Sequence, residues 1–530
     1  MRRIVFWTML ALLLLGTFAL AFNVGLVHAL PLETVYINGD GSVSPSDAPI
    51  SSVDNVTYTL TGNISTALPP TFYFGIVVER NNTIFDGNGY TVQGSYSVDM
   101  EFWLAGITLS DTSNVTIEDA NIQGFYDGIR LVNSSNNVIN WNNLTGNFDD
   151  GIHTQDSGNN TISGNNITRN VSYGIVVFGD SNNNVIRGNN VEGILLDLGC
   201  SNNIVSGNNE KPEGFSTYLY LSDSSNNTVS GNNATIYLFG SSNNIVSGND
   251  ATAFDLGAGT YPDYGICLDN DSNNNTISGN NVTANTHGDI YESCIMFQSS
   301  SNNNTVSGNN VTANSGLSIE LTDSSNNTIY HNNFVGKIVQ ASVDSASVGD
   351  SWDNGYPSGG NYWSNYNGTD LYSGSYQNVT GSDGIGDTPY IVDTNNTDHY
   401  PLMGGFSDFS VAPGADVQVI SNSTVSDFQF NGNALLFNVS GVNGTTGFCN
   451  ICIQTALLNG TLSVFVNGTR VQYNLLPISN SSISYLYFTY GHSTEQVIIM
   501  PEFPDSLILA MFMLAALLAI ATYKKEHEGS

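Results

Sequence analysis

One eight-residue motif recurs through most of the chain and constrains its fold more than any other feature. The clearest copy is Asn-Asn-Thr-Ile-Ser-Gly-Asn-Asn at residues 159–166. Further copies begin at Asn81, Asn136, Asn183, Asn202, Asn226, Asn243, Asn274, Asn303 and Asn326. From Asn136 onward the copies start 23, 24, 19, 24, 17, 31, 29 and 23 residues apart. Self-similarity with a period of about 20 to 30 residues indicates a solenoid built from stacked coils.

The residues inside the motif select the kind of solenoid. Short apolar–polar alternation, as in Thr161-Ile162-Ser163, is typical of half-buried strands. Asparagine and glycine tolerate the left-handed backbone that tight corners need. The repeats lack both the spacing of paired helices and the leucine pattern of leucine-rich repeats. We therefore predict a parallel β-helix, right-handed because parallel crossovers nearly always are.

The alternation also predicts which side chains face inward. One aliphatic residue per coil is expected to stack into a buried ladder: Ile162, Ile186, Val205, Val229, Ile277, Val306 and Ile329. Equivalent asparagines are expected to stack at the corners, with their amides hydrogen-bonded along the axis. Replacing one of these corner residues, as in Asn309→Ala, is predicted to cost about 1 kcal/mol or less.

These coils resemble the right-handed parallel β-helix repeats of NosD-like proteins, which belong to a carbohydrate-binding and sugar-hydrolysis class of β-helices. The end of the repeat region resembles the usual close of that domain, at Trp352–Gly355, Gly360–Ser364, Asp383–Tyr390 and Tyr400–Leu402. The resemblance spans roughly residues 80 to 405. It implies the fold but not the activity, since such coils serve lyases, hydrolases, copper-site accessory proteins and plain surface rods.

The composition divides the chain into six segments. We expect a signal peptide at residues 1–29, an N-terminal cap with the first strands at 30–80, β-helix repeats at 81–340 and an aromatic, glycine-rich cap at 341–405. Residues 406–500 lack the motif and are expected to form a small antiparallel β-sandwich. Its expected strands are Val417–Ile420, Leu435–Val439, Leu462–Val466, Ser484–Tyr490 and Gln496–Ile499. Residues 501–530 hold a sorting-like motif, an apolar span and a basic tail.

The N-terminus has the character of a secretory signal. Arg2-Arg3 precedes an apolar run that ends at Phe22, and a small residue follows at Ala29. Cleavage is expected near Ala29, with an uncleaved anchor as the alternative.

The C-terminus has three parts: Pro501-Glu502-Phe503-Pro504, an apolar span at 507–523 and Lys524-Lys525. This tail resembles the archaeal and bacterial sorting signals called PEF-CTERM. The resemblance implies a cut by a sortase-like processing enzyme and attachment to lipid, and the alternative is a single transmembrane helix. Either way, the intervening chain is expected on the extracellular face of the membrane.

The charge of the chain limits its partners. Lys and Arg number 11 against 46 Asp and Glu, a formal net charge of −35, whereas a nucleic-acid binder needs a basic face. About two dozen Asn-X-Ser/Thr sequons, among them Asn55, Asn166, Asn281, Asn310 and Asn467, suit a glycosylated exterior. The expected partners are glycans or envelope proteins, and no nucleic acid.

The five cysteines form neither a disulfide framework nor a zinc pattern. Cys449 and Cys452 have the spacing of a redox pair, but residues three apart on a strand point to opposite faces. We therefore expect Cys449 to be a core residue.

Alignment of the coils brings charged residues together. Asp127-Gly128-Ile129-Arg130 superposes on Asp150-Gly151-Ile152-His153, so Asp127 should stack on Asp150 and Arg130 on His153, with Asp149 alongside. Paired carboxylates beside a histidine are what acid–base hydrolysis of a glycoside needs. Because the neighbours are mostly Gly, Asn and Ser, we expect these carboxylates to be solvated and to line no deep pocket. The cluster is a candidate for binding a glycan or an ion, and the alternative is ordinary turn chemistry.

Two enzyme families offer partial matches. Asp149-Asp150-Gly151 resembles the Asp-Asp of polygalacturonases, but the Asn-Thr-Asp, Gly-His-Gly and Arg-Ile-Lys of that family are missing. A pectate lyase needs a calcium site beside an Arg or Lys base, and the nearest basic residues, Arg169 and Arg187, have no acidic trio around them. The sequence therefore favours a hydrolase over a lyase.

A metal is the next possibility. Asp383 and Asp387 lie four apart in a glycine-rich loop that suits Ca²⁺, with a tight turn as the alternative. Copper is implied by the NosD resemblance alone. Copper sites need clustered His, Met or Cys, whereas His153, His287, His331 and His399 are scattered.

The cap at 341–405 is rich in aromatic residues. They are Trp352, Tyr356, Tyr362, Trp363, Tyr366, Tyr372 and Tyr376. Such residues can stack on sugar rings, but we expect them to plug the apolar end of the β-helix.

The sequence thus predicts an all-β chain with a right-handed parallel β-helix, a small antiparallel β-sandwich, an N-terminal signal and a C-terminal transmembrane helix. The expected function is that of a cell-surface protein that is structural, adhesive or glycan-binding. There are two alternatives. One is a polysaccharide-active enzyme on the same scaffold, either a glycoside hydrolase or a lyase, and the other is a NosD-like metal-site accessory protein.

Overall fold

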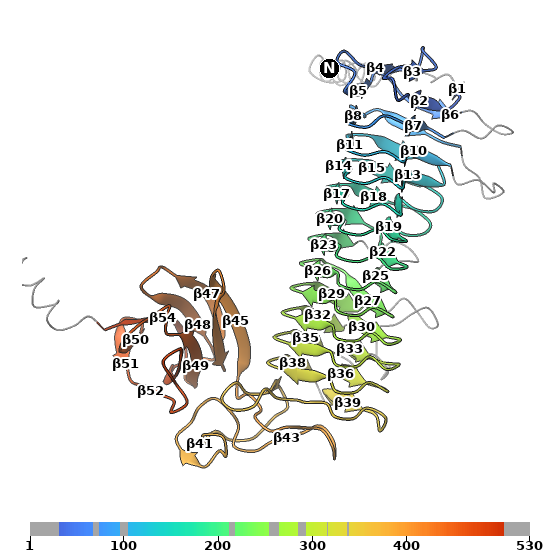
Figure 1. Ribbon diagram of the computed structural model, residues 1–530. Helices are drawn as coiled ribbons and strands as arrows, with labels where there is room; N and C mark the ends of the chain where they lie inside the picture. The colour runs from blue at the N-terminus through green and yellow to red at the C-terminus, as the bar shows by residue number, and fades with distance from the viewer. Residues whose placement is uncertain are drawn as a thin grey trace, which may run out of the picture. The chain divides into compact units, whose positions relative to one another are not determined.

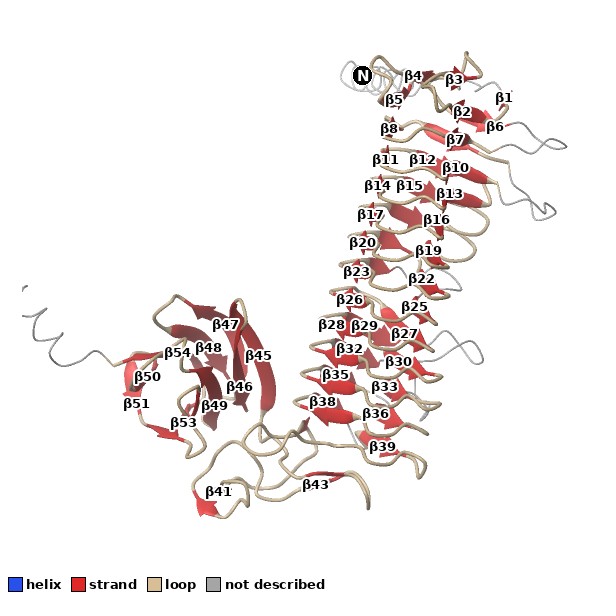
Figure 2. Ribbon diagram, viewed as in Figure 1, coloured by secondary structure: helices blue, strands red, loops and turns tan. Residues whose placement is uncertain are grey.

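The computed structural model describes residues 31–66, 74–95, 104–210, 218–253, 264–284, 293–314, 316–336 and 339–502. All regular elements in these ranges are strands (Figure 2). None of the described residues forms a helix long and apolar enough to cross a membrane. The signal and the C-terminal span predicted from the sequence lie outside the described residues. The chain forms two compact units, Met1–Tyr218 and Leu219–Ser530.

The first unit is a parallel β-helix with three sheets, here called A, B and C. Neighbouring coils pair strand by strand, so β10 lies between β7 and β13 (Figure 1). Sheet A contains β1(Pro31–Leu32), β6(Ile64–Thr66), β9(Thr91–Gln93), β12(Asn121–Gln123), β15(Asn143–Thr145), β18(Asn166–Thr168), β21(Asn190–Val191) and β24(Asn209–Glu210). Sheet B contains β3(Val43–Ser44), β2(Val35–Ile37), β7(Ile76–Val78), β10(Ala105–Ser110), β13(Asp127–Val132), β16(Ile152–Gln155), β19(Ile175–Phe178) and β22(Ile194–Asp197). Sheet C contains β4(Ile50–Ser51), β5(Thr57–Leu60), β8(Thr83–Asp86), β11(Val115–Glu118), β14(Val138–Asn140), β17(Thr161–Ser163), β20(Val185–Arg187) and β23(Ile204–Ser206).

The second unit begins with coils of the same kind, and β25(Tyr218–Ser222) lies at the division. Its B strands are β27(Thr235–Phe239), β30(Ile266–Asp269), β33(Ser293–Phe297), β36(Leu317–Leu321) and β39(Ala341–Val343). Its C strands are β26(Thr228–Ser230), β28(Ile245–Ser247), β31(Thr276–Ser278), β34(Thr305–Ser307) and β37(Thr328–Tyr330). Its A strands are β29(Asp250–Ala253), β32(Asn281–Ala284), β35(Asn310–Ala313), β38(Asn333–Gly336) and β40(Tyr362–Trp363).

The predicted aliphatic ladder is confirmed. In the first unit Ile162 pairs with Ile186, which pairs with Val205. In the second unit the pairing runs from Val229 through Val246, Ile277 and Val306 to Ile329. Every one of these side chains is fully buried. A continuous apolar stack of this kind is the main favourable term for each coil.

The asparagines form two internal ladders rather than a surface feature. In one of them, the Oδ1 atoms of Asn160, Asn184 and Asn203 each accept the backbone N–H of the preceding asparagine, at 2.7–2.8 Å. The second runs through Asn142, Asn165, Asn189 and Asn208 in the same way. The hydrogen bonding along the axis is as predicted. The burial raises the cost expected for replacing Asn309 above the value expected from the sequence, because these side chains replace backbone pairing at the corners.

The expected β-sandwich follows the coils. Two antiparallel sheets enclose one apolar core. One contains β45(Gly405–Ala412), β46(Ala415–Ser421), β49(Thr446–Gln454), β53(Ile483–Gly491) and β52(Tyr473–Leu475), and the other β47(Thr424–Phe430), β48(Leu435–Ser440), β54(Thr494–Pro501), β50(Leu462–Val466) and β51(Thr469–Val471). All five predicted strands are present. Cys449 is fully buried in this core, as expected.

The aromatic cap joins coils and sandwich with short hairpins, β41(Tyr372–Ser373) with β42(Val379–Thr380) and β43(Tyr390–Ile391) with β44(Thr397–Asp398). Trp352 and Trp363 are each 1% exposed. The Trp363 ring lies 4.7 Å from Phe334 of the last coil and 4.3 Å from Tyr390, between centroids. These two tryptophans plug the β-helix as predicted, whereas Tyr376 is exposed.

Candidate functional site

Two sheet B strands of the first unit carry the predicted cluster, and a glycine shapes the start of each. A Cβ atom at Gly128 would lie 2.4 Å from Leu144 Cδ2, and one at Gly151 would lie 2.2 Å from Ile167 Cγ2. Any larger residue would therefore collide with the aliphatic lining of sheet A. The glycines let the backbone run close to the core and so keep the flanking charged residues of the two coils together.

The charged residues form two equivalent pairs, which the coil alignment did not predict; it predicted that Arg130 stacks on His153. Arg130 Nη1 lies 2.7 Å from Asp127 Oδ2, and His153 Nδ1 lies 2.9 Å from Asp150 Oδ2. Arg130 pairs with His153 across the parallel strands β13 and β16. Arg130 also donates to Gln155 Oε1 at 3.3 Å. The two basic side chains are thus oriented by carboxylates of their own strands and stand side by side.

The expectation that the carboxylates are solvated is wrong for two of the three. Asp127 is 0% exposed and Asp150 is 3% exposed. Each also accepts a backbone N–H from the next coil: Asp127 Oδ1 from Asp150 at 3.4 Å, and Asp150 Oδ1 from Tyr173 at 3.3 Å. The side chains are held inward because they complete backbone hydrogen bonding between coils, a role that composition alone does not reveal.

Burial changes the acidity of the cluster. Desolvation and the neighbouring Asp150 carboxylate raise the pKa of Asp127 to about 6, although His153 and Arg130 oppose the shift. The charged and neutral forms of Asp127 are therefore both accessible near neutral pH. Asp127 can therefore take up or release a proton near neutral pH, which an ordinary surface aspartate does not do.

Asp149 lies beside the pairs but has a different partner. It is half-buried, and the Tyr126 hydroxyl donates a hydrogen bond to its carboxylate. Burial raises the pKa of Asp149, and the Asp150 charge adds to the effect. The ring of Tyr126 lies 6.0 Å from that of Phe148, between centroids. These two aromatic residues directly precede Asp127 and Asp149 in the sequence.

The sequence interpretation missed several residues of this site. It treated the surroundings as Gly, Asn and Ser and overlooked Tyr126, Phe148 and Gln155. The signal was available, because Tyr126 precedes Asp127 and Gln155 occupies the outward position two residues after His153. Reading the positions around each aligned Asp-Gly-Ile, rather than the motif alone, would have found them.

A metal could be held by three members of the cluster. One ligand atom each from Asp127, Asp150 and His153 lies within 4.8 Å of the others. Among the described residues this is the one group of three or more His, Cys, Asp or Glu that meets this criterion.

Asp383 and Asp387, the residues predicted for a cation loop, serve as acceptors for backbone groups. Asp383 Oδ1 accepts the N–H of Ile385 at 3.1 Å. Asp387 accepts the N–H groups of Leu371 at 2.9 Å and Tyr372 at 3.0 Å. A third acid, Asp370, accepts the N–H groups of Asp383 and Gly384 at 3.0 and 2.8 Å. These bonds hold a turn together, and Ca²⁺ binding here stays a prediction.

Two protein-family models match the coils. The model described as "Periplasmic copper-binding protein (NosD)" matches residues 191–368, and the model "Right handed beta helix region" matches residues 73–210. A comparison with curated proteins gives no match.

Solved structures with similar coils include three carbohydrate enzymes. The mannuronan C-5 epimerase AlgE6 A-module of Azotobacter vinelandii is 16% identical with a TM-score of 0.37, over 61% of this chain and 89% of that chain. The periplasmic alginate epimerase AlgG is 16% identical with a TM-score of 0.29, over 60% and 82%. DFA-IIIase from Arthrobacter chlorophenolicus A6 in complex with GF2 is 14% identical with a TM-score of 0.27, over 56% and 68%.

The cluster does not fit the copper of the matched description. It offers one imidazole and two carboxylates, and Asp127 is already paired with the Arg130 guanidinium. Copper prefers several imidazole or sulfur ligands. Nothing in the donor set of the cluster therefore points to copper. Over residues matched by the two family models, the chain is a right-handed parallel β-helix similar to NosD proteins.

Proposed function

We propose that the protein acts outside the cell as a glycan-binding β-helix, and that Asp127, Arg130, Asp150 and His153 form a binding site. The observation that carries the proposal is that the same pair of an aspartate and a basic residue occurs in two adjacent coils, at β13 and at β16. Arg130 and His153 stand at paired positions, each held by the carboxylate three residues before it. Two pre-oriented nitrogen groups on adjacent strands, whose backbones lie about 4.8 Å apart, can bond oxygens of one saccharide without ordering long side chains first.

The location rests on two supports. The matched NosD model is described as periplasmic, and the N-terminal sequence has the pattern of a secretory signal. We propose in addition that the C-terminal tail anchors the protein at the extracellular face of the membrane, as a retained span or after sortase-like processing.

Titration of the purified protein with a panel of neutral and acidic oligosaccharides tests the binding site. Arg130→Gln and His153→Gln should each lower the affinity for the glycan about ten-fold or more, which corresponds to about 1.4 kcal/mol. Asp197→Asn is the matched control, because Asp197 lies at the end of β22 in the same sheet, outside the cluster. Binding that survives both cluster variants would assign the glycan to another surface.

A second candidate is acid–base catalysis on a polysaccharide, and the Asp150–His153 contact favours it. When Nδ1 carries the proton and donates to Asp150, Nε2 is left as a base. Asp127 and Asp150 approach each other within 4.8 Å, and each is engaged by a basic residue. A hydrolase needs two free carboxyls about 5–5.5 or 6.5–9.5 Å apart, whereas both carboxylates here are engaged. A single histidine base therefore describes the site better.

The proposed reaction is abstraction by His153 of a proton next to a sugar carboxylate, with Arg130 binding that carboxylate. The electron pair of the broken C–H bond then either expels the neighbouring glycosidic oxygen, which leaves as a hydroxyl after taking up a proton, or bonds a proton on the other face of the ring. A lyase-type or epimerase-type step therefore fits the arrangement of these residues better than hydrolysis does. The test is turnover on polyuronates, followed by the ultraviolet absorbance of an unsaturated product and by the ratio of sugar epimers. His153→Gln should abolish turnover while Arg130→Lys retains part of it. Absence of any product with the unaltered protein would leave binding alone as the function of the site.

A further inference from the structure

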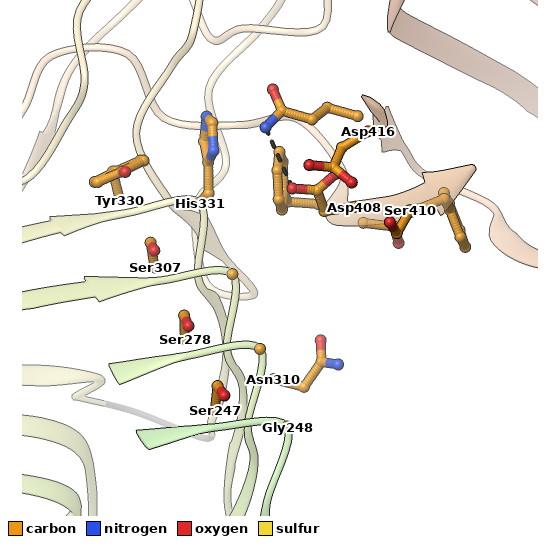
Figure 3. A pocket seen from close by; sticks show the side chains of 16 residues that line it. Ser247, Gly248, Ser278, Ser307, Asn310, Tyr330, His331, Asp408, Ser410 and Asp416 are labelled. Atoms are coloured by element: carbon orange, nitrogen blue, oxygen red, sulfur yellow. Dashed lines mark hydrogen bonds between the residues drawn. The ribbon is translucent and has the colours of Figure 1, made fainter. Parts of the chain in front are cut away.

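The second unit contains an open groove of about 710 Å³ between the coil corners and the first two strands of the sandwich. One wall is formed by Ser247, Ser278 and Ser307, each followed by a glycine. The other wall includes Asp408 of β45 and Asp416 of β46. Figure 3 shows the three serines stacked above one another, with the two aspartates on the sandwich side, beside His331 and toward the Ser307 end of the row.

The serine wall is a regular array of hydroxyl groups. Ser247 pairs with Ser278, and Ser278 with Ser307, in the parallel C strands. Successive hydroxyls are therefore about 4.8 Å apart. None of the three hydroxyls makes a hydrogen bond to another of the described residues. The glycine after each serine has φ of 62°, 62° and 68°, so no side chain covers the corner between the hydroxyls.

The opposite wall presents carboxylates. Asp408 pairs with Gln418 and Ser410 pairs with Asp416, so Asp408 and Asp416 occupy diagonal positions on one face of the hairpin. Gln418 Nε2 lies 3.4 Å from Asp408 Oδ2. Asp416 is exposed. No Lys or Arg is among the described residues that line the groove. An anionic ligand would thus meet two carboxylates without a compensating cation.

Contacts between the coils and the sandwich strand hold the two walls of the groove together. Asn333 Oδ1 accepts the N–H of Phe406 at 2.7 Å, and Asn333 Nδ2 donates to the Phe406 carbonyl at 2.8 Å. The Phe406 ring stacks on His331, with centroids 4.0 Å apart and planes 18° apart. His331 is 4% exposed and lines the groove. Phe406 is 6% exposed and its ring covers that of His331, so this aromatic floor holds the two walls in place before a ligand arrives and offers no free ring face.

His331 presents a neutral imidazole in this floor. Burial lowers the pKa of His331 to about 4, so the ring is uncharged at neutral pH. Its Nε2 lies 2.7 Å from the Ser358 carbonyl, which fixes the proton there and leaves Nδ1 as an acceptor. Within the described part of the chain no donor bonds to Nδ1.

We propose that this groove binds an extended neutral oligosaccharide along the serine wall. A row of hydroxyls facing carboxylates, with no cations, is a set of groups that recognises uncharged sugars by hydrogen bonding. Three coil spacings, from Ser247 to the coil of Tyr330, give about 14 Å of wall, enough for a short oligosaccharide chain. The site lies in the second unit, and the proposal does not depend on the Asp127–His153 cluster.

Calorimetric titration of the full-length protein tests the groove, with neutral hexasaccharides of glucose, mannose and N-acetylglucosamine as probes. At least one should bind, and hexagalacturonate should not bind in the groove. Ser278→Gln fills the middle of the wall and Asp416→Ala removes an exposed acceptor, so each should lower affinity about ten-fold or more. Ser206→Gln is the matched control, since Ser206 holds the same motif position in the first unit, and it should stay within about two-fold.

Three results would overturn the proposal: no binding by any neutral hexasaccharide, binding unchanged in both groove variants, or tighter binding of a lysine-rich peptide than of every sugar. Circular dichroism and the melting temperature of each variant establish that it is folded. His153→Gln separates the two sites, because it should leave neutral-sugar binding in the groove unchanged even where it abolishes binding at the cluster.

Discussion

Asn309 and Asn332 are joined by two hydrogen bonds to a single oxygen. Asn332 Oδ1 accepts the backbone N–H of Asn309 at 3.1 Å and its side-chain N–H at 2.8 Å. Both residues are fully buried. The same bifurcated acceptance links Asn280 to Asn309 at 2.9 Å for both bonds. Each asparagine thus supplies, from its side chain, the acceptor that the backbone of the neighbouring coil lacks at a corner.

Asn309→Ala should therefore lower the free energy of unfolding by about 3 kcal/mol or more, because the buried Asn280 N–H and Ile277 carbonyl each lose the hydrogen bond that Asn309 provides. Urea unfolding measures the loss. Asn310→Ala is the control: Asn310 is exposed, and its replacement should cost about 1 kcal/mol or less. Equal losses from the two variants would contradict the structural role of the internal ladder.

Ile277→Asp should prevent or severely weaken folding of the second unit. The carboxylate would sit unpaired between Val246 and Val306, at a cost of several kcal/mol. Ile245→Asp is a matched control, because Ile245 faces outward from β28 and is 46% exposed. Its expected cost is within about 1 kcal/mol. Thermal unfolding of the two variants compares the inward and outward faces directly.

Gly151→Ala tests the backbone position that assembles the cluster. The new Cβ would lie 2.2 Å from Ile167 Cγ2 and 2.6 Å from the Gly174 carbonyl oxygen, so we expect a loss of about 3 kcal/mol and weaker glycan binding. In Gly188→Ala the Cβ has open space around it but the backbone has φ 61°. Only the conformational cost, about 1–2 kcal/mol, should appear there, with glycan binding retained.

Stability should increase as pH falls from about 7 to about 5. Burial raises the pKa of Asp127, Asp350 and Asp383 to about 6, and of Asp370 and Asp398 to about 7. In an unfolded chain the pKa of aspartate is near 3.9, so between pH 7 and 5 the folded state binds protons that the unfolded chain does not bind. The free energy of unfolding therefore rises on acidification. Lower repulsion within a chain of net charge −35 acts in the same direction.

Below about pH 4 the trend should reverse, because hydrogen bonds hold the pKa of Asp40, Asp54 and Asp344 below the usual value and their contribution is then lost. Urea unfolding at several pH values measures the profile. Asp127→Asn should flatten its slope between pH 7 and 5, and the exposed Asp180→Asn should not. A steady fall in stability from pH 7 to 5 would show that the buried carboxylates are not neutralised on folding.

The five cysteines should differ in their reactivity toward an alkylating reagent. No disulfide joins them, and all but Cys452 are buried. Burial raises the pKa of Cys449 to about 11 and of Cys294 to about 12, which keeps these thiols protonated. Mass spectrometry should find at most one label, on Cys452, in the native protein and five in denaturant. A rapid label on native Cys449 would place it outside the core.

The sequence by itself determined the coil fold and its alignment. Strand alternation and corner residues act within a few positions, and each coil repeats the contacts of the one before. This is why the motif identified Ile277 as inward-facing and placed Arg130 beside His153. The alternating runs likewise located five sandwich strands, whereas the other five, β45, β47, β49, β51 and β52, were missed. In β49, polar and cysteine residues interrupt the pattern.

Only the tertiary structure decided which polar groups are buried and which surfaces face each other. Asp127 and Asp150 are inside because they accept N–H groups one coil away, and the asparagine amides are internal for the same reason. The groove joins Ser278 to Asp416, residues whose proximity depends on how the sandwich strand packs against the coils. Burial and long-range packing are properties of the assembled chain, so a local pattern does not specify them.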